Sequence, residues 1–200
     1  MFSVTMAPLD LRTFVLYNLV MNNLQVSSQK INLMVGSHTT HQMLELIARM
    51  ACLGPVRVID GCNCCDGFQL AHRISQMTIE LYPAMERILT VWPDNCYKMH
   101  TMVTQAPQDG IPLLIPGMLT TFYDEDVSLK ETQRLLRSCL ETLLSLRATQ
   151  SVIISASPPI QRIAERKILL DMLMEAADRT IFVQEVQDAK KTATQLSLFS

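Results

Sequence analysis

Short apolar runs alternate with segments of helical periodicity along most of this chain, and this alternation is what most limits its fold. The runs cover residues 31–36, 56–61, 87–92, 111–117, 150–157 and 180–186. They are apolar almost throughout instead of at every second position, which is typical of strands buried on both faces. Helices between such strands supply the crossovers that parallel pairing requires. The sequence therefore predicts an α/β fold with a mainly parallel sheet of about six strands flanked by helices.

The segments between the runs have the apolar spacing of helices that pack one face on a core. Helices are expected through Leu44, Ile47 and Ala48 and at residues 68–81, 95–105, 128–147 and 160–177. Ser128 and Glu131 form an S-x-x-E pair, the pattern of a capping box, where the longest helix begins. Arg162, Arg166 and Lys167 near the start of the last helix are interpreted as solvated surface.

The length of 200 residues fits one domain, and 48% hydrophobic against 18% charged residues indicates a large apolar core. We divide the chain into an N-terminal helical segment (1–28), an α/β core (29–187) and a flexible polar tail (188–200). Asp10, Arg12 and Asn18 interrupt the N-terminal apolar stretch well short of the ~20 residues that a membrane span needs. A cytoplasmic protein without membrane contact is expected.

The formal net charge of -2 gives no overall attraction to phosphate backbones. Contact with DNA would need a local basic patch, and the sequence leaves open whether one exists.

The six cysteines are expected to be reduced, because the chain is long, rich in core residues and without a secretory signal. Three of them, Cys62, Cys64 and Cys65, form one crowded cluster with histidines nearby in the sequence. Structural zinc sites normally use two separated pairs of ligands, so we interpret the cluster as small buried residues of a strand-to-helix turn. No metal and no other cofactor is predicted.

The segment GSHTTHQM, which follows the first apolar run, is the candidate nucleotide loop. It comprises Gly36, Ser37, His38, Thr39, Thr40, His41, Gln42 and Met43. A phosphate-binding loop has the pattern GxxxxGK[ST], in which backbone N–H groups and a lysine hold the phosphates. Gly36 matches its first glycine, but His41, Gln42 and Met43 replace the second glycine, the lysine and the hydroxyl residue. An ordinary turn is the alternative interpretation.

Four later segments extend this comparison. They read VRVIDGCNCCDGFQLAHRI, RILTVWPDNCYKMHTMV, IPLLIPGMLTTFYDEDVSLKETQRLLRSCLETLLSL and QSVIISASPP. Read in order, they resemble the core of RecA/RadA-type recombinases over roughly residues 31–186, by element order and hydrophobic spacing. The resemblance places Gly117 where a magnesium-holding aspartate would stand and Cys62 where the water-activating glutamate would stand, with Asp60 left alone. Phosphoryl transfer depends on positioning and charge compensation, so the resemblance implies that the protein is not an enzyme.

The tail ends in QLSLF, formed by Gln195, Leu196, Ser197, Leu198 and Phe199. This pentapeptide resembles the one by which bacterial polymerases and repair proteins dock on the replication sliding clamp. A polar tail can present a few hydrophobic anchors that carry most of the binding energy. The alternative is that these residues pack on the protein's own domain.

Together, these resemblances imply a catalytically inactive RecA-like adaptor or accessory protein of bacterial DNA repair or replication. Its expected partners are the sliding clamp and either a second copy of itself, as a homodimer, or another RecA-like protein. A nucleotide-binding recombinase paralogue with residual ATP binding and a self-associating regulator resembling a RecA-like division inhibitor are the alternatives.

Overall fold

A computed structural model describes residues 29–37 and 39–183, and its centre is one six-stranded sheet with the order β3-β2-β4-β5-β1-β6. The strands are β1 (Ile31–Val35), β2 (Val56–Ile59), β3 (Ile88–Val91), β4 (Leu113–Ile115), β5 (Val152–Ala156) and β6 (Arg179–Phe182). All neighbouring strands are parallel. The predicted α/β fold is confirmed. Because β4 and β5 lie between β2 and β1, the order differs from the 3-2-1-4-5-6 order of dinucleotide-binding folds.

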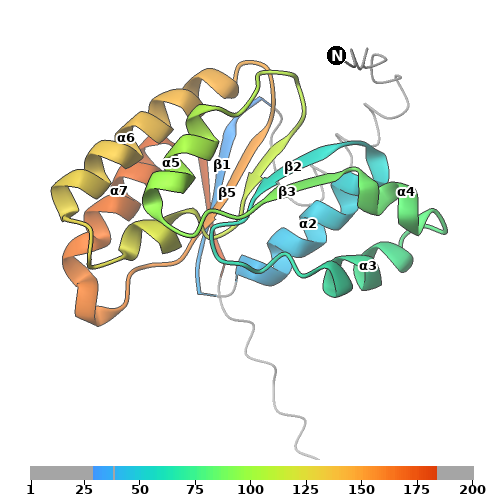
Figure 1. Ribbon diagram of the computed structural model, residues 1–200, viewed down its shortest axis with the longest axis horizontal. Coiled ribbons are helices and arrows are strands. Elements are labelled where there is room, and N and C mark those ends of the chain that lie inside the picture. Colours follow the sequence, from blue (N-terminus) through green and yellow to red (C-terminus); the bar gives the residue numbers. More distant parts are fainter. Residues whose placement is uncertain (1–28, 38, 184–200) are drawn as a thin grey trace, which may run out of the picture.

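Helices cover both faces of the sheet, as Figure 1 shows. One face carries α2 (Thr39–Leu53), α3 (Gly67–Ser75) and α4 (Leu81–Glu86), and the other carries α5 (Cys96–Thr104), α6 (Leu129–Leu146) and α7 (Lys167–Ala176). Two 3₁₀ segments, η1 (Met118–Tyr123) and η2 (Gln161–Arg166), precede α6 and α7. Among the described residues, no helix combines the length and apolar character needed to cross a membrane.

Alternate residues of the central strands supply two separate cores. In β1, Leu33 and Val35 join the core under α5, α6 and α7, whereas Met34 joins the core under α2, α3 and α4. All five residues of β1 are buried, as are all five of β5. The continuous apolar runs of the sequence therefore mark strands that are covered on both sides.

The two edge strands differ from this pattern. In β3, Leu89 and Val91 are exposed while Ile88 and Thr90 are half-buried. Phe182 at the end of β6 is also exposed. An edge strand has a neighbour on one side alone and is incompletely covered by helices, so its apolar run is not buried on both faces.

The single helix expected at residues 68–81 is wrong in its extent, because α3 ends at Ser75 and α4 begins only at Leu81. Asp66 caps α3 by accepting a hydrogen bond from the N–H of Phe68 (3.2 Å), and the helix ends at Ser75. Beyond it Ile79 is fully exposed, so the apolar spacing that suggested one long helix is not used for packing. Pro83 lies in the first turn of α4, a position where proline removes no helical hydrogen bond.

The start of α6 agrees with the capping prediction in part. Ser128 is the N-cap residue, and its Oγ accepts a hydrogen bond from the N–H of Glu131 (3.3 Å). The carboxylate of Glu131 pairs with Arg134 (2.7 Å) instead of returning to the N-cap residue. The helix is therefore capped by the serine, without the reciprocal bond of a full capping box.

The prediction of a solvated Arg166 is wrong. This side chain is 4% exposed, and its guanidinium donates to the carbonyl oxygens of Phe122 (2.8 Å) and Val127 (2.7 Å). Arg162 and Lys167 are exposed as expected. Arg166 thus ties η2 to η1 and to the loop before α6, because its planar fork satisfies carbonyl groups that would otherwise be buried without donors.

Candidate functional site

Residues of the predicted nucleotide site gather at the carboxyl edge of the sheet. Gly36 follows β1, Asp60 follows β2, and Gly117 lies two residues beyond β4. Since all strands are parallel, their carboxyl ends meet along one edge, which is where ligands bind in open α/β sheets. These three residues therefore lie at the same edge of the sheet.

Hydrogen bonds between successive strand ends hold this edge together. They run from Gly61 N to Pro116 O (2.9 Å), Gly117 N to Ser155 Oγ (3.0 Å), Gly36 N to Ala156 O (3.1 Å) and Ser157 Oγ to Gly36 O (3.1 Å). Ser155 and Ser157 were not predicted as site residues. A polar residue at the end of an otherwise apolar strand was the signal for both.

The connection between β1 and α2 is shorter than the expected loop. The strand ends at Val35 and α2 begins at Thr39, so residues 39–43 are helical. Thr39 and Met43 are buried, with Met43 fully enclosed in the core under α2. The interpretation of residues 36–43 as a loop over their whole length is wrong, because Met43 and the apolar positions after it extend the helix toward the strand.

The side chain of Gln42 supplies no cation to the end of β1, and His41 lies beside an arginine of α3. His41 is exposed, and its Nε2 lies 3.4 Å from Nη1 of Arg73 on α3. Arg73 also lies 3.6 Å from a carboxylate oxygen of Glu45. Gln42 is half-buried, and within the described part of the chain its Oε1 has no hydrogen-bond partner. A lysine would contribute a charge at this position, whereas the amide contributes none.

Gly36 is required by the packing of the chain. A Cβ at this position would collide with the carbonyl oxygen of Val183 and lie 3.3 Å from its Cβ. Val183 is held there by a hydrogen bond from its N–H to the carbonyl oxygen of Val35 (2.8 Å). The absence of a side chain therefore allows the residue after β6 to approach β1 closely, which explains this glycine without a bound phosphate.

Asp60 is bound by the turn that follows it. The residue is 1% exposed, its Oδ2 accepts from the N–H of Cys65 (2.7 Å), and its Oδ1 accepts from the N–H of Cys62 (3.3 Å). The thiol of Cys62 also donates to Oδ1 (3.6 Å). Asn63 has a φ of 53°, and asparagine tolerates this left-handed conformation better than most residues do. The residues after Asp60 therefore form a turn whose N–H groups surround its carboxylate.

The thiols of Cys62 and Cys64 lie beside this carboxylate. Their Sγ atoms and a carboxylate oxygen of Asp60 all lie within 4.8 Å of one another. The hydrogen bond between the two thiols, together with burial and the neighbouring Asp60, raises the pKa of the Cys62 thiol. A neutral thiol is a poor nucleophile, so Cys62 is not activated for covalent catalysis. All six cysteines are free.

Cys62 and Gly117 fill the space between the ends of β2 and β4. Gly117 has a φ of 59°, and a Cβ on it would lie 2.5 Å from Cβ and 2.8 Å from Sγ of Cys62. A left-handed φ already disfavours any side chain at this position. The carboxylate that the RecA-type resemblance would place here has no room while Cys62 is present.

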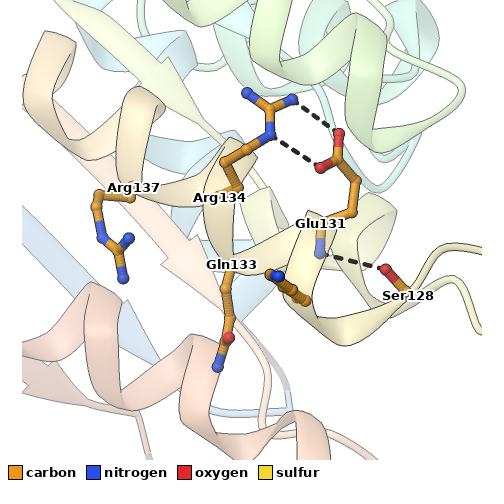
Figure 2. A pocket seen from close by; sticks show the side chains of 6 residues that line it. Ser128, Glu131, Gln133, Arg134 and Arg137 are labelled. Atoms are coloured by element: carbon orange, nitrogen blue, oxygen red, sulfur yellow. Dashed lines mark hydrogen bonds and ion pairs between the residues drawn. The ribbon is translucent and has the colours of Figure 1, made fainter.

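A small hollow of about 290 Å³ lies over the start of α6 and is drawn in Figure 2. Its lining consists of Ser128, Lys130, Glu131, Gln133, Arg134 and Arg137. All of these belong to one helix and its N-cap, and the ion pair between Glu131 and Arg134 crosses it. No residue from the carboxyl ends of the strands contributes to it, so we assign it no function.

The predicted clamp-binding residues, Gln195, Leu196, Ser197, Leu198 and Phe199, lie outside the described residues, as do His38 and the N-terminal segment 1–28. No protein-family model matches the chain, and no curated protein matches it at a significant level. The RecA-type and clamp-binding resemblances therefore remain predictions from the residues themselves.

Proposed function

We propose that this protein is a RecA-like adaptor that does not hydrolyse ATP and acts by binding other proteins in bacterial DNA repair or replication, in the cytoplasm. The six-stranded parallel sheet is consistent with a RecA-like core. The observation that carries the proposal is the close approach of Cys62 to Gly117, the two positions where the resemblance to recombinases would place catalytic carboxylates.

Most of the charged groups that the resemblance to recombinases would require for ATP hydrolysis are absent from this edge. Gln42 stands where the phosphate-binding lysine would be, and it brings no positive charge. The remaining carboxylate, Asp60, accepts hydrogen bonds from the N–H groups of Cys62 and Cys65 within its own turn. Phosphoryl transfer depends on charge compensation. We therefore propose that this edge does not hydrolyse ATP, even if it binds a nucleotide.

Exposed apolar side chains next to this edge support a role in protein binding. Trp92 follows β3 and is 55% exposed, and Leu89 and Val91 on the same edge strand are exposed as well. The N–H of Asp60 donates to the carbonyl oxygen of Val91 (2.9 Å), so this strand adjoins the candidate site. Contiguous apolar surface and unpaired strand edges are common at protein interfaces. We propose a second copy of this chain or another RecA-like protein as the partner here.

The sliding clamp is the proposed partner of the tail. The support is the pentapeptide of residues 195–199 alone, in which a glutamine, a leucine and a terminal Leu-Phe pair stand at the spacing of clamp-docking peptides. A short peptide with a few apolar anchors suits a preformed groove.

The test of the core proposal is a direct measurement of nucleotide chemistry on the full-length protein. Phosphate release from ATP, with and without DNA, is expected to stay at background. Turnover that disappears in a folded Asp60→Asn variant would contradict the proposal. If a fluorescent ATP analogue binds saturably but is not hydrolysed, the adaptor proposal would be wrong, and the alternative of a nucleotide-binding recombinase paralogue would be favoured.

A further inference from the structure

We propose that Asp60, Cys62 and Cys64 form a binding site for Zn²⁺ at the carboxyl end of β2. One carboxylate oxygen and two Sγ atoms lie within 4.8 Å of one another there. In a tetrahedral zinc site, bond lengths of about 2.0 to 2.3 Å place neighbouring donor atoms about 3.5 Å apart. The donor atoms therefore need to approach one another by about 1.3 Å at most. This site is independent of the adaptor proposal, since it requires neither a nucleotide nor a partner protein.

The turn between β2 and α3, which can be followed in Figure 1, builds this cluster before any ion binds. Asp60 is fixed at the strand end by the hydrogen bond from its own N–H to Val91. Cys62 is held to the carboxylate by its own N–H, and the left-handed conformation of Asn63 reverses the chain before Cys64, whose thiol also lies near the carboxylate. A turn held in this way loses little conformational freedom when it binds an ion.

The carboxylate keeps lone pairs free for a metal ion. Its oxygens accept the N–H groups of Cys62 and Cys65, and each carboxylate oxygen offers two acceptor positions. Such hydrogen bonds orient metal-binding carboxylates in known sites. They would hold Asp60 in place as a ligand. The thiol of Cys62 donates a hydrogen bond to Oδ1, and the ion would replace the proton of that bond.

The donor types favour zinc over the harder cations. Two sulfur ligands and one oxygen ligand suit Zn²⁺, whereas Mg²⁺ and Ca²⁺ prefer oxygen alone. Binding exchanges the two thiol protons for the ion and releases both protons to the solvent. Three protein ligands leave the fourth tetrahedral position for water. Cys62 and Cys64 are half-buried, so solvent and ions can reach the cluster.

The third cysteine of the turn differs from Cys62, whereas Cys64, which is half-buried, also packs against the core under α2, α3 and α4. Cys65 is 8% exposed and belongs to the apolar core under α2, α3 and α4, as small buried cysteines commonly do. Cys62 belongs to neither apolar core, and it faces a buried carboxylate. Apolar packing therefore accounts for the cysteine at position 65. It does not account for the thiol of Cys62, which lies against the carboxylate of Asp60.

The test uses the full-length, metal-free protein with a non-coordinating reductant. Titration with Co²⁺ is expected to give a thiolate-to-cobalt charge-transfer band and intense visible bands of tetrahedral coordination, saturating at one ion per chain and lost when Zn²⁺ is added. Cys62→Ser and Cys64→Ser should each lower the affinity at least tenfold. A serine hydroxyl can still donate to Asp60, so the turn is expected to remain folded, as circular dichroism would verify.

Cys52→Ser is the matched control, because Cys52 is also half-buried but lies at the end of α2 and outside the cluster. It should leave both the spectrum and the affinity unchanged. The absence of stoichiometric Co²⁺ binding would overturn the proposal, and so would an unchanged spectrum in the folded double variant Cys62→Ser/Cys64→Ser.

Discussion

Cys62 and Gly117 lie side by side although 55 positions separate them in the chain (117 − 62), and a Cβ on Gly117 would stand 2.5 Å from that of Cys62. The pair closes the space between β2 and β4 where the resemblance to recombinases would place two carboxylates. Because the two residues are so close, a side chain added at Gly117 should change the stability of the protein.

Gly117→Ala should destabilise the fold by about 2 kcal/mol or more, because it adds a left-handed alanine and a collision with Cys62. In a Cys62→Gly background the collision disappears, and a smaller loss should remain. Urea denaturation of the four proteins in this double-mutant cycle measures the coupling. Strictly additive effects of the two substitutions would show that the side chains do not compete for this space.

Arg166→Met should cost about 3 kcal/mol of unfolding free energy, because two buried carbonyl oxygens lose their donor. These are the carbonyls of Phe122 and Val127, and Arg166 is 4% exposed. Arg162→Met is the control: Arg162 is exposed and pairs with Glu125 at the surface, so its loss should cost less than about 1 kcal/mol. Equal urea midpoints for the two variants would contradict the structural role of Arg166.

Asp178 should contribute to the acid sensitivity of the protein. The N–H of Ile31, which donates to its carboxylate (2.9 Å), and the guanidinium of Arg147 lower the pKa of Asp178 below its ordinary value. A carboxyl whose folded pKa is lowered stabilises the protein above its unfolded pKa of about 3.9 and loses this contribution as the pH falls through the folded value.

Asp178→Asn tests this contribution. The variant should be less stable than the parent protein at neutral pH, and the difference should shrink as the pH falls below about 4. Urea midpoints measured across this range give the comparison. A constant difference at every pH would exclude ionisation of Asp178 as its cause.

Phe199→Ala in the tail should weaken binding to a bacterial sliding clamp by about 2 kcal/mol, roughly thirtyfold, by removing the aromatic anchor. The melting temperature should not change, and Thr194→Ala, just outside the pentapeptide, should leave both quantities unchanged. If the tail instead packs on its own domain, the same substitution would lower the melting temperature and spare clamp binding.

The positions of the strands could be predicted because continuous apolar runs are a local property. Residues 150–157 were expected as a strand, and β5 occupies Val152–Ala156 within them. Whether a run is central or at an edge is not local. Residues 87–92 are mostly apolar, yet β3 lies at the edge of the sheet and exposes Leu89 and Val91.

By itself, the sequence determined the order of the strands along the chain, the serine cap of α6 and the absence of a lysine at Gln42, because each depends on residue type and short-range spacing. The tertiary structure decided that Cys62 meets Gly117 and that Asp60 joins two thiols. The first contact needs the pairing of β2 with β4. The second needs the hydrogen bond from the N–H of Cys62 to Asp60 and the left-handed conformation of Asn63, which precedes Cys64. Backbone conformation and strand pairing set both distances, and neither can be read from the identity of the residues that they bring together.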